Sequence, residues 1–229
     1  MLDFLAVGDV MLDVRLPAGP ERHGTIDSLA AGSAVNAARE ATRLGARAGV
    51  AGAIGDDLLG RVIELELEEG GLETFLVRIA GAATGTAVYG DRVVADRGAN
   101  ASYLPDELPD ARVTLVSGYL PEPARVRALE LAGGLRAVDL QGVAGSAPGA
   151  DVVLGPGLDL DELAPHHRIV VSTLGADGAV AVSGGRRLSA APARVLPESP
   201  VGAGDAFAAQ FLLALADGRS LDDALQAAV

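Results

Sequence analysis

The chain has 229 residues, of which 49% are hydrophobic, and its formal net charge is −13. It contains neither cysteine nor lysine, which excludes disulfides, cysteine-ligated metal sites, the lysine-dependent phosphate loop and lysine Schiff-base chemistry. The acidity predicts no binding to nucleic acid or to anionic membranes. The first residues are typical of a strand and not of a signal peptide, so we expect a cytoplasmic protein.

Strand-like and helix-like segments alternate along the chain. Buried strands are predicted where short, nearly continuous apolar runs occur, at 4–9, 48–55, 73–78, 113–119, 135–140, 150–155 and 168–175. Helical spacing is present at 33–45, 57–71, 122–134, 204–216 and 220–229. This alternation predicts an α/β fold with a mostly parallel central sheet flanked by helices.

Two segments do not follow this alternation, at about 10–29 and at about 84–100. The second contains two β-like runs around Gly90-Asp91, a hairpin turn signal. Stray β segments of this kind can form a small lid at the mouth of a parallel sheet, where ligands bind outside the carboxyl ends of the strands. We therefore predict a single domain, 1–229, with a small β lid.

A cluster of small residues precedes the most apolar helix. In "SPVGAGDAFAAQFLLALADG" (199–218), Gly202 and Gly204 can adopt backbone angles closed to other residues, and they carry no side chain that would cover the first helix amides. These amides carry the positive end of the helix dipole, so a phosphate can approach them. Asp205 is placed to accept a proton from an attacking hydroxyl, and this location favours its ionised form. A simple helix N-cap is the alternative explanation.

Five ordered stretches resemble the ribokinase-like (PfkB) carbohydrate kinase family. They are "GDVMLD" (8–13), "AGSAVNAAREATRLGARAGVAGAIGDDLLG" (31–60), "DRGAN" (96–100), "STLGADGAVAV" (172–182) and "GAGDAF" (202–207). The resemblance covers essentially the whole chain. It implies a Rossmann-like sheet with a β lid, and transfer of the γ-phosphoryl group of ATP, with Mg²⁺, to a hydroxyl of a monosaccharide or sugar acid.

The resemblance also implies a role for particular residues. Asp205 resembles the catalytic base, and the amides of Gly202, Ala203 and Gly204 resemble the anion hole. The substrate-binding residues that it implies are Asp13, Gly32 and Asn36, and the nucleotide-side residues are Thr173, Gly175 and Gly178. Each position also has a purely structural explanation: Asp13 and Gly32 as turn residues, Asn36 as a polar residue of a first helical turn, and the two later glycines as hairpin residues.

The chain departs from the family pattern at four places. Ser199-Pro200-Val201 replaces an Asp-Thr-Thr whose Asp helps to hold a monovalent cation, so we expect no dependence on such a cation. The family's N-x-x-E, linked to magnesium, is replaced by Gly157-Leu158-Asp159-Leu160, so no metal ligand is assigned. Ala31 replaces a glycine of the sugar motif. The sequence ends at Val229, where family members continue along the adenine pocket, which predicts a weaker nucleotide site.

These departures leave two alternatives to a sugar kinase. The first is a sugar-binding regulatory protein whose kinase activity is impaired or lost. The second is a nucleoside kinase, which needs an aromatic side chain to stack on the base, and Tyr89, Tyr103 and Tyr119 are candidates. The expected partner is a small-molecule sugar, and the family resemblance also implies a homodimer formed through the lid.

Overall fold

The structure is a computed structural model that describes residues 1–16, 24–143, 147–192 and 202–229. A nine-stranded sheet forms its centre, with the strand order β13-β12-β11-β10-β9-β8-β1-β4-β5. The seven strands from β11 to β5 run parallel, and β12 and β13 are antiparallel additions at one edge. The bounds are β1 Leu2–Val7, β4 Ala48–Gly55, β5 Glu73–Ile79, β8 Ala111–Ser117, β9 Leu135–Asp139, β10 Val152–Pro156, β11 Ile169–Thr173, β12 Ala179–Ser183 and β13 Arg186–Ala190.

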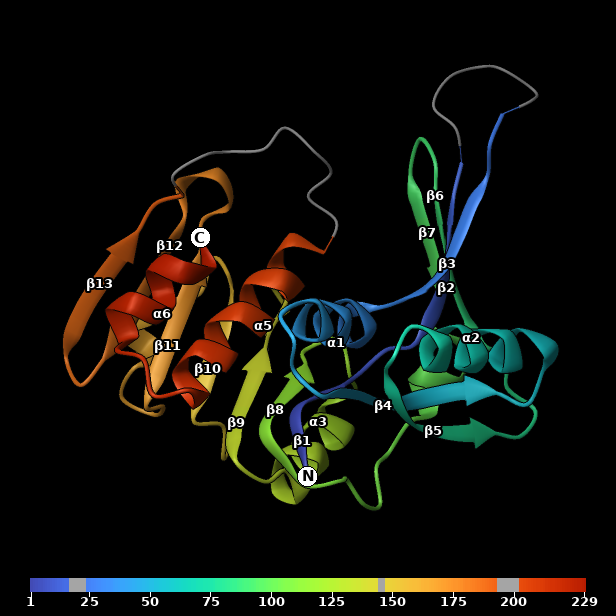
Figure 1. Cartoon of the computed structure of the whole chain (residues 1–229), viewed down its shortest axis with the longest axis horizontal. Coiled ribbons are helices and arrows are strands. Elements are labelled where there is room, and N and C mark those ends of the chain that lie inside the picture. Colours follow the sequence, from blue (N-terminus) through green and yellow to red (C-terminus); the bar gives the residue numbers. More distant parts are fainter. Residues whose placement is uncertain (17–23, 144–146, 193–201) are drawn as a thin grey trace.

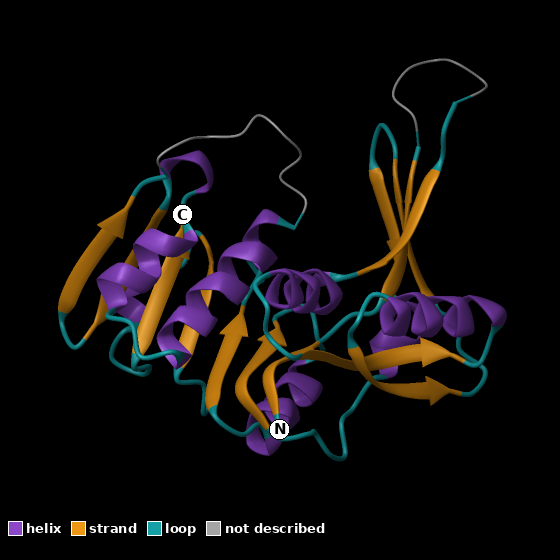
Figure 2. Cartoon of the chain, in the orientation of Figure 1, coloured by secondary structure: helices purple, strands orange, loops and turns teal. Residues whose placement is uncertain are grey.

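Helices cover both faces of this sheet, as Figures 1 and 2 show. The helices are α1 Ser33–Arg43, α2 Leu58–Glu69, α3 Glu122–Leu131, α4 Leu160–Leu163, α5 Ala203–Ala216 and α6 Leu221–Ala228, with short 3₁₀ turns η1 Gly98–Ser102 and η2 Gly175–Asp177. Successive residues of β1 point to opposite faces: Phe4 packs in the same cluster as α5, whereas Leu5 packs in the cluster that contains α3. The predicted fold class, a Rossmann-like α/β sheet with helices on both sides, is confirmed.

The two segments outside the alternation form a second, four-stranded sheet. Its order is β3-β2-β6-β7, with β2 Met11–Arg15, β3 Asp27–Ala31, β6 Gly85–Tyr89 and β7 Val93–Asp96. This small sheet projects away from the body of the molecule, above α2 in Figure 1. It is mixed, because β2 and β6 are parallel while the β2–β3 and β6–β7 pairs are antiparallel.

Buried polar contacts fix the base of the small sheet. Asn100 accepts a hydrogen bond from the Val10 amide and donates one to the Val10 carbonyl, both at 2.9 Å. Arg97 donates two hydrogen bonds to the Asp9 carboxylate, at 2.6 and 3.0 Å. These contacts join the end of β1 to the turn after β7, so the lid strands leave the body in a defined direction.

The predicted boundaries differ little from the observed ones. The first strand begins at Leu2 and ends at Val7, so Gly8 and Asp9 lie beyond the strand and not inside it. Among the described residues, every helix is too short or too polar to cross a bilayer. Ser199-Pro200-Val201 lies outside the described residues, so the structure gives no information on the predicted loss of the monovalent cation.

Candidate active site

The N-terminus of α5 lies at the carboxyl ends of the central strands, where parallel sheets bind their ligands (Figure 1). Gly202 is the N-cap residue, and its φ of 84° is in the left-handed region that a glycine adopts without strain. No side chain caps the first amides of the helix. A Cβ built on Gly204 would meet no atom within 4 Å. Among the described residues, neither a capping side chain nor a neighbour of Gly204 covers this end of the helix, and the anion hole stays a prediction.

Asp205 lies in the first turn of α5 and is only 8% exposed. Its Oδ2 atom accepts a hydrogen bond of 3.0 Å from the Asn36 amide nitrogen, and its Oδ1 atom accepts one of 3.0 Å from Gln141. The explanation of Asp205 as the N-cap is wrong, because Gly202 occupies that position. The carboxylate is instead held by two amide side chains from distant parts of the chain.

A cavity of about 460 Å³ opens between this helix end and the small sheet. The carboxylate of Asp205 lines it, and so do the residues predicted to bind substrate, Asp13, Gly32 and Asn36. Alternate residues of three lid strands form the opposite wall, since residues two apart in a strand share a face. These are Met11 and Asp13 of β2, Ala87 and Tyr89 of β6, and Val93 and Ala95 of β7.

Gly32 lines the cavity, and the backbone at this position also requires a glycine. It is the N-cap of α1 with φ 110°, and a Cβ there would lie 2.1 Å from the Asp9 carbonyl oxygen. Only glycine allows α1 to begin this close to the end of β1. Because α1 begins there, the side chain of Asn36, in the first turn of the helix, reaches Asp205 and donates a hydrogen bond to it.

Burial controls the carboxyl groups of this site. Burial raises the pKa of Asp205 to about 6, although the hydrogen bonds from Asn36 and Gln141 oppose the rise. Burial also raises the pKa of Asp13, offset in part by a hydrogen bond from Tyr89 and by the charges of Arg15 and Arg39. We expected the helix end to favour the ionised form, but desolvation is the larger effect. Asp205 is still mostly ionised at pH 7, as a general base must be.

The residues predicted for the nucleotide side line a second cavity of about 220 Å³. It contains Thr173 at the end of β11, Gly175, the first residue of η2, and Gly178, which directly follows η2. Ala203 and Gly204 of α5 also line it, with an apolar remainder of Pro192, Phe207, Ala228 and Val229. The first turn of α5 therefore contributes to both cavities: Asp205 to the first, and Ala203 and Gly204 to the second.

A side chain would clash with the backbone at Gly178 but would have space at Gly175. At Gly178, with φ 90°, a Cβ would lie 2.0 Å from the Ala190 carbonyl oxygen, so the turn needs glycine in order to pack on β13. At Gly175, with φ 60°, a Cβ would meet nothing within 4 Å. The hairpin explanation is therefore sufficient for Gly178, and its place in the second cavity is an additional fact.

Several residues of the site were not predicted from the sequence. Asp139, the last residue of β9, and Gln141 lie beside Asp205, and Asp9 and Arg97 line the first cavity as an ion pair. Burial raises the pKa of Asp139 to about 7, opposed by a hydrogen bond from the Gln141 amide and increased by the charge of Asp205. A carboxylate directly after an apolar strand, as in "LRAVDLQG" (135–142), is the signal that could have identified Asp139.

The acidic residues that follow β10 do not form a cage for magnesium. Asp159 caps α4 and accepts hydrogen bonds from the amides of Asp161 and Glu162, each at 3.1 Å. Asp161 is also paired with Arg187 at 3.3 Å. Across the described ranges, no three His, Cys, Asp or Glu side chains are grouped as metal ligands. The donor set therefore does not fit a magnesium ion held by protein side chains alone.

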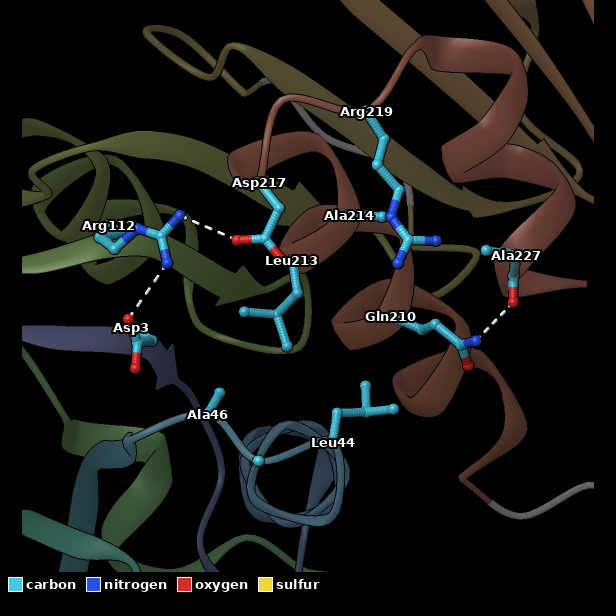
Figure 3. Close-up of a pocket in the computed structure, with 11 residues that line it drawn as sticks. Asp3, Leu44, Ala46, Arg112, Gln210, Leu213, Ala214, Asp217, Arg219 and Ala227 are labelled. Atoms are coloured by element: carbon cyan, nitrogen blue, oxygen red, sulfur yellow. Dashed lines mark hydrogen bonds and ion pairs between the residues drawn. The ribbon is translucent and has the colours of Figure 1, made fainter.

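A third cavity, of about 290 Å³, lies at the opposite end of α5 (Figure 3). Arg112 of β8 contacts Asp217 at 2.9 Å, Asp3 at 3.2 Å and the Ala216 carbonyl at 3.0 Å. These contacts fasten the C-terminal end of α5 to β1 and β8. Because the helix is fixed at this end, its other end has a defined position relative to the sheet.

Comparison of the sequence with models of protein families identifies the family of this chain. The model of the pfkB family carbohydrate kinases matches residues 1–139 and 159–229. The chain belongs to the pfkB family. The kinases of this family are phosphotransferases. A search of curated protein sequences found no match.

Solved structures with the same fold include three kinases of different names. An adenosine kinase from Sinorhizobium meliloti has a TM-score of 0.82 and 22% identity, with 99% of this chain and 91% of that chain covered. A ribokinase from Thermotoga maritima has a TM-score of 0.84 and 19% identity, covering 98% and 89%. An E. coli protein described as a ribokinase II, in complex with ATP and Mg²⁺, has a TM-score of 0.82 and 17% identity, covering 98% and 89%. At these identities, the likeness concerns the fold.

Proposed function

We propose that this pfkB protein is an ATP-dependent kinase that transfers the γ-phosphoryl group to a hydroxyl of a monosaccharide or sugar acid. One observation carries the proposal. The first turn of α5 presents a buried carboxylate, Asp205, to a cavity lined by Asp13 and Asn36, while its preceding residues border the second cavity. An acceptor hydroxyl and a phosphate can therefore meet at one helix end.

Each part of the site has a role in this proposal. Asp13 and Asn36 hold sugar hydroxyls, because a carboxylate accepts and an amide both donates and accepts directed hydrogen bonds. Asp205 removes the proton of the attacking hydroxyl. The amides at Gly202, Ala203 and Gly204 stabilise the charge of the transferred group.

The nucleotide belongs to the second cavity, beside Thr173, Gly175 and Gly178. When bound, ATP supplies the phosphoryl group and magnesium neutralises phosphate charge. Since the described residues offer no cage for the ion, we place it mainly on phosphate oxygens and water, as is common for magnesium. The neighbour solved with ATP and Mg²⁺ supports this assignment by fold alone.

A nucleoside is the second candidate acceptor. Tyr89 and Tyr119 line the first cavity together with the apolar side chains of Met11 and Val93, and aromatic rings stack on flat bases. Tyr103 is buried elsewhere, in the cluster beneath the other face of the sheet, and is no longer a candidate. The similar fold of a structure named adenosine kinase is consistent with this reading.

A coupled assay of ADP release tests these alternatives. The purified protein is assayed with ATP and magnesium against D-ribose, D-fructose, D-glucose, D-gluconate and adenosine, and its melting temperature is measured with each acceptor. We expect a sugar to give turnover. Faster turnover with adenosine would favour the nucleoside kinase. Stabilisation by a sugar without turnover at any magnesium concentration would contradict the kinase and favour the sugar-binding regulator.

Assembly and location are further proposals. We propose a homodimer formed through the small sheet, whose β7 strand is exposed along its whole length, in the cytoplasm. Light scattering at several protein concentrations measures the assembly state. A mass of one chain, 23.0 kDa, at all concentrations would contradict the dimer.

A further inference from the structure

Gln141 makes an unusual set of hydrogen bonds between two buried carboxylates. Its side-chain nitrogen donates to Asp139 Oδ2 at 2.7 Å and to Asp205 Oδ1 at 3.0 Å. Its backbone amide donates to the other oxygen of Asp139, at 3.0 Å. Asp139 is 3% exposed and belongs to β9 in the middle of the sheet. Asp139 therefore orients Gln141 through both of its oxygens, and Gln141 in turn reaches Asp205.

The backbone of Gln141 is strained. With φ 52°, it is the single non-glycine residue with positive φ in the part of the chain that the structure describes. Glycine or asparagine is the usual residue in this conformation, because a longer side chain is unfavourable there. Strain that persists at a cavity wall is a reason to look for a function of the side chain.

We propose that Gln141 is a positioning residue that, held by Asp139, fixes the carboxylate of Asp205 against the acceptor. This inference rests on the proposed phosphoryl transfer. Gln141 and Asn36 each donate to a different oxygen of Asp205. A carboxylate oxygen has two lone pairs, so one donor on each oxygen still leaves a lone pair for the proton of the substrate hydroxyl. Two fixed donors also determine the plane of the carboxylate.

The surrounding charges give this arrangement a second consequence. The charge of Asp205 adds to the burial that raises the pKa of Asp139, whereas the hydrogen bonds from Asn36 and Gln141 lower the pKa of Asp205. Burial raises the pKa of Tyr119, which lines the same cavity, and the charges of Asp205, Asp139 and Asp9 raise it further. Asp13 and Arg97 are the remaining charged residues that line the cavity. Gln141 therefore favours the ionised form of Asp205, and Asp139 acts on Asp205 by orienting Gln141.

Two substitutions separate positioning from packing. Gln141→Gly removes the amide and also removes the backbone strain, so the variant should fold. Asp139→Asn keeps an oxygen that accepts from the backbone of Gln141 but replaces the oxygen that holds its side chain with an NH₂ group. Gln210→Ala is the matched control, because Gln210 of α5 also donates its side-chain amide, to the Ala227 carbonyl, but does so beside the third cavity.

The experiment measures kcat, KM and their pH dependence with the best acceptor of the panel, together with melting temperature. We expect Gln141→Gly to lower kcat about 10- to 100-fold with KM changed less than about threefold, as for a misplaced catalytic group. In a plot of kcat against pH, the fall in kcat on the acidic side (the acid limb) should move to higher pH in Gln141→Gly, because the ionised form of Asp205 has lost a hydrogen-bond donor. Asp139→Asn should lower kcat and move the acid limb in the same direction as Gln141→Gly but by less, because Gln141 is then less firmly oriented, and Gln210→Ala should keep the wild-type limb and kcat.

The outcomes separate this inference from the proposed function. If the wild type transfers phosphate and the Gln141→Gly protein keeps its kcat, or if its acid limb does not move, the positioning role is wrong while the kinase remains. If the wild type is inactive with every acceptor, the proposed function fails and the positioning role fails with it.

Discussion

Helix α5 carries a hydrogen-bonded carboxylate at each end, and the two differ in their surroundings. Asp205 at the N-terminal end is 8% exposed and is held by amide side chains. Asp217, just beyond the C-terminal end, has a side chain that is 56% exposed and is paired with Arg112. Burial makes the ionised form of Asp205 costly and so raises its affinity for a proton, which a base needs. Solvent screens the ion pair of Asp217 with Arg112, which therefore contributes little. The difference shows how one helix serves as a support at one end and as a site at the other.

After loss of the Asp205 carboxylate itself, the largest effect is expected from filling the open space at the N-terminal end. Gly204→Val places a side chain over the first amides, where a Cβ meets no neighbour, so the fold should tolerate it. Phosphate would lose its close approach, and kcat/KM for ATP should fall about 100-fold, as after loss of an anion-hole donor. Steady-state kinetics with varied ATP measures this.

A matched glycine provides the control for this substitution. At Gly133, in the loop before β9, a Cβ would meet no atom closer than 3.9 Å. Gly133→Val should therefore leave kcat/KM unchanged. Unchanged kinetics in Gly204→Val would show that the helix end does not bind phosphate.

A smaller effect is expected on stability. The pKa of Asp205 rises from 3.8 to about 6 on folding, so the folded protein binds the proton more tightly. The tighter proton binding stabilises the folded state fully below pH 4, and this stabilisation is lost as the pH rises through 6. The free energy of unfolding changes by on the order of 3 kcal/mol between these limits. Asp205→Asn cannot ionise, so it does not lose this stability as the pH rises. Its NH₂ group, however, faces one of the two amide donors, and this donor–donor contact costs about 1 kcal/mol. The variant should be about 2 kcal/mol more stable than wild type at pH 8.

Urea unfolding at pH 5 and pH 8 measures this difference. The advantage of Asp205→Asn should shrink at pH 5, because the wild-type carboxyl is then largely protonated. Asp217→Asn, at the exposed end of the same helix, should not be stabilised at either pH. Equal unfolding free energies of wild type and Asp205→Asn at pH 8 would mean that burial of this carboxylate has no cost.

The smallest effect is expected at the opposite end of the helix. Arg112→Ala removes two exposed ion pairs and a hydrogen bond to the Ala216 carbonyl. The free energy of unfolding should fall by about 1 kcal/mol, since such pairs are solvent-screened, and kcat should stay within about twofold of wild type. A large loss of kcat in a protein of nearly normal stability would show that this end of α5 also controls the site.

The sequence predicted the parts of the site that depend on local geometry. Gly202, Gly204 and Asp205 define a helix end, and apolar runs with glycine stops define the strands that lead to it. The pairing of Asn36 with Asp205 could be expected only from the family resemblance, because the two residues are 169 positions apart.

Other features depend on tertiary packing, which no local pattern encodes. Gln141 enters the site because an unusual φ turns its side chain back towards Asp139. The pKa of Asp205 could not be predicted in direction, since the helix end and burial act oppositely and only the structure shows that burial is larger. The ion pair of Arg97 with Asp9 likewise joins the lid to β1 across 88 residues.

The central claim is that Asp205 is the base at a phosphate-binding helix end. It is tested most directly by comparing Asp205→Asn with wild type in the ADP-release assay, with acceptor affinity measured by calorimetry. We expect kcat to fall about 1,000-fold or more, while the dissociation constant for the acceptor changes less than about threefold. A variant that binds the acceptor normally and retains the wild-type kcat would contradict this account.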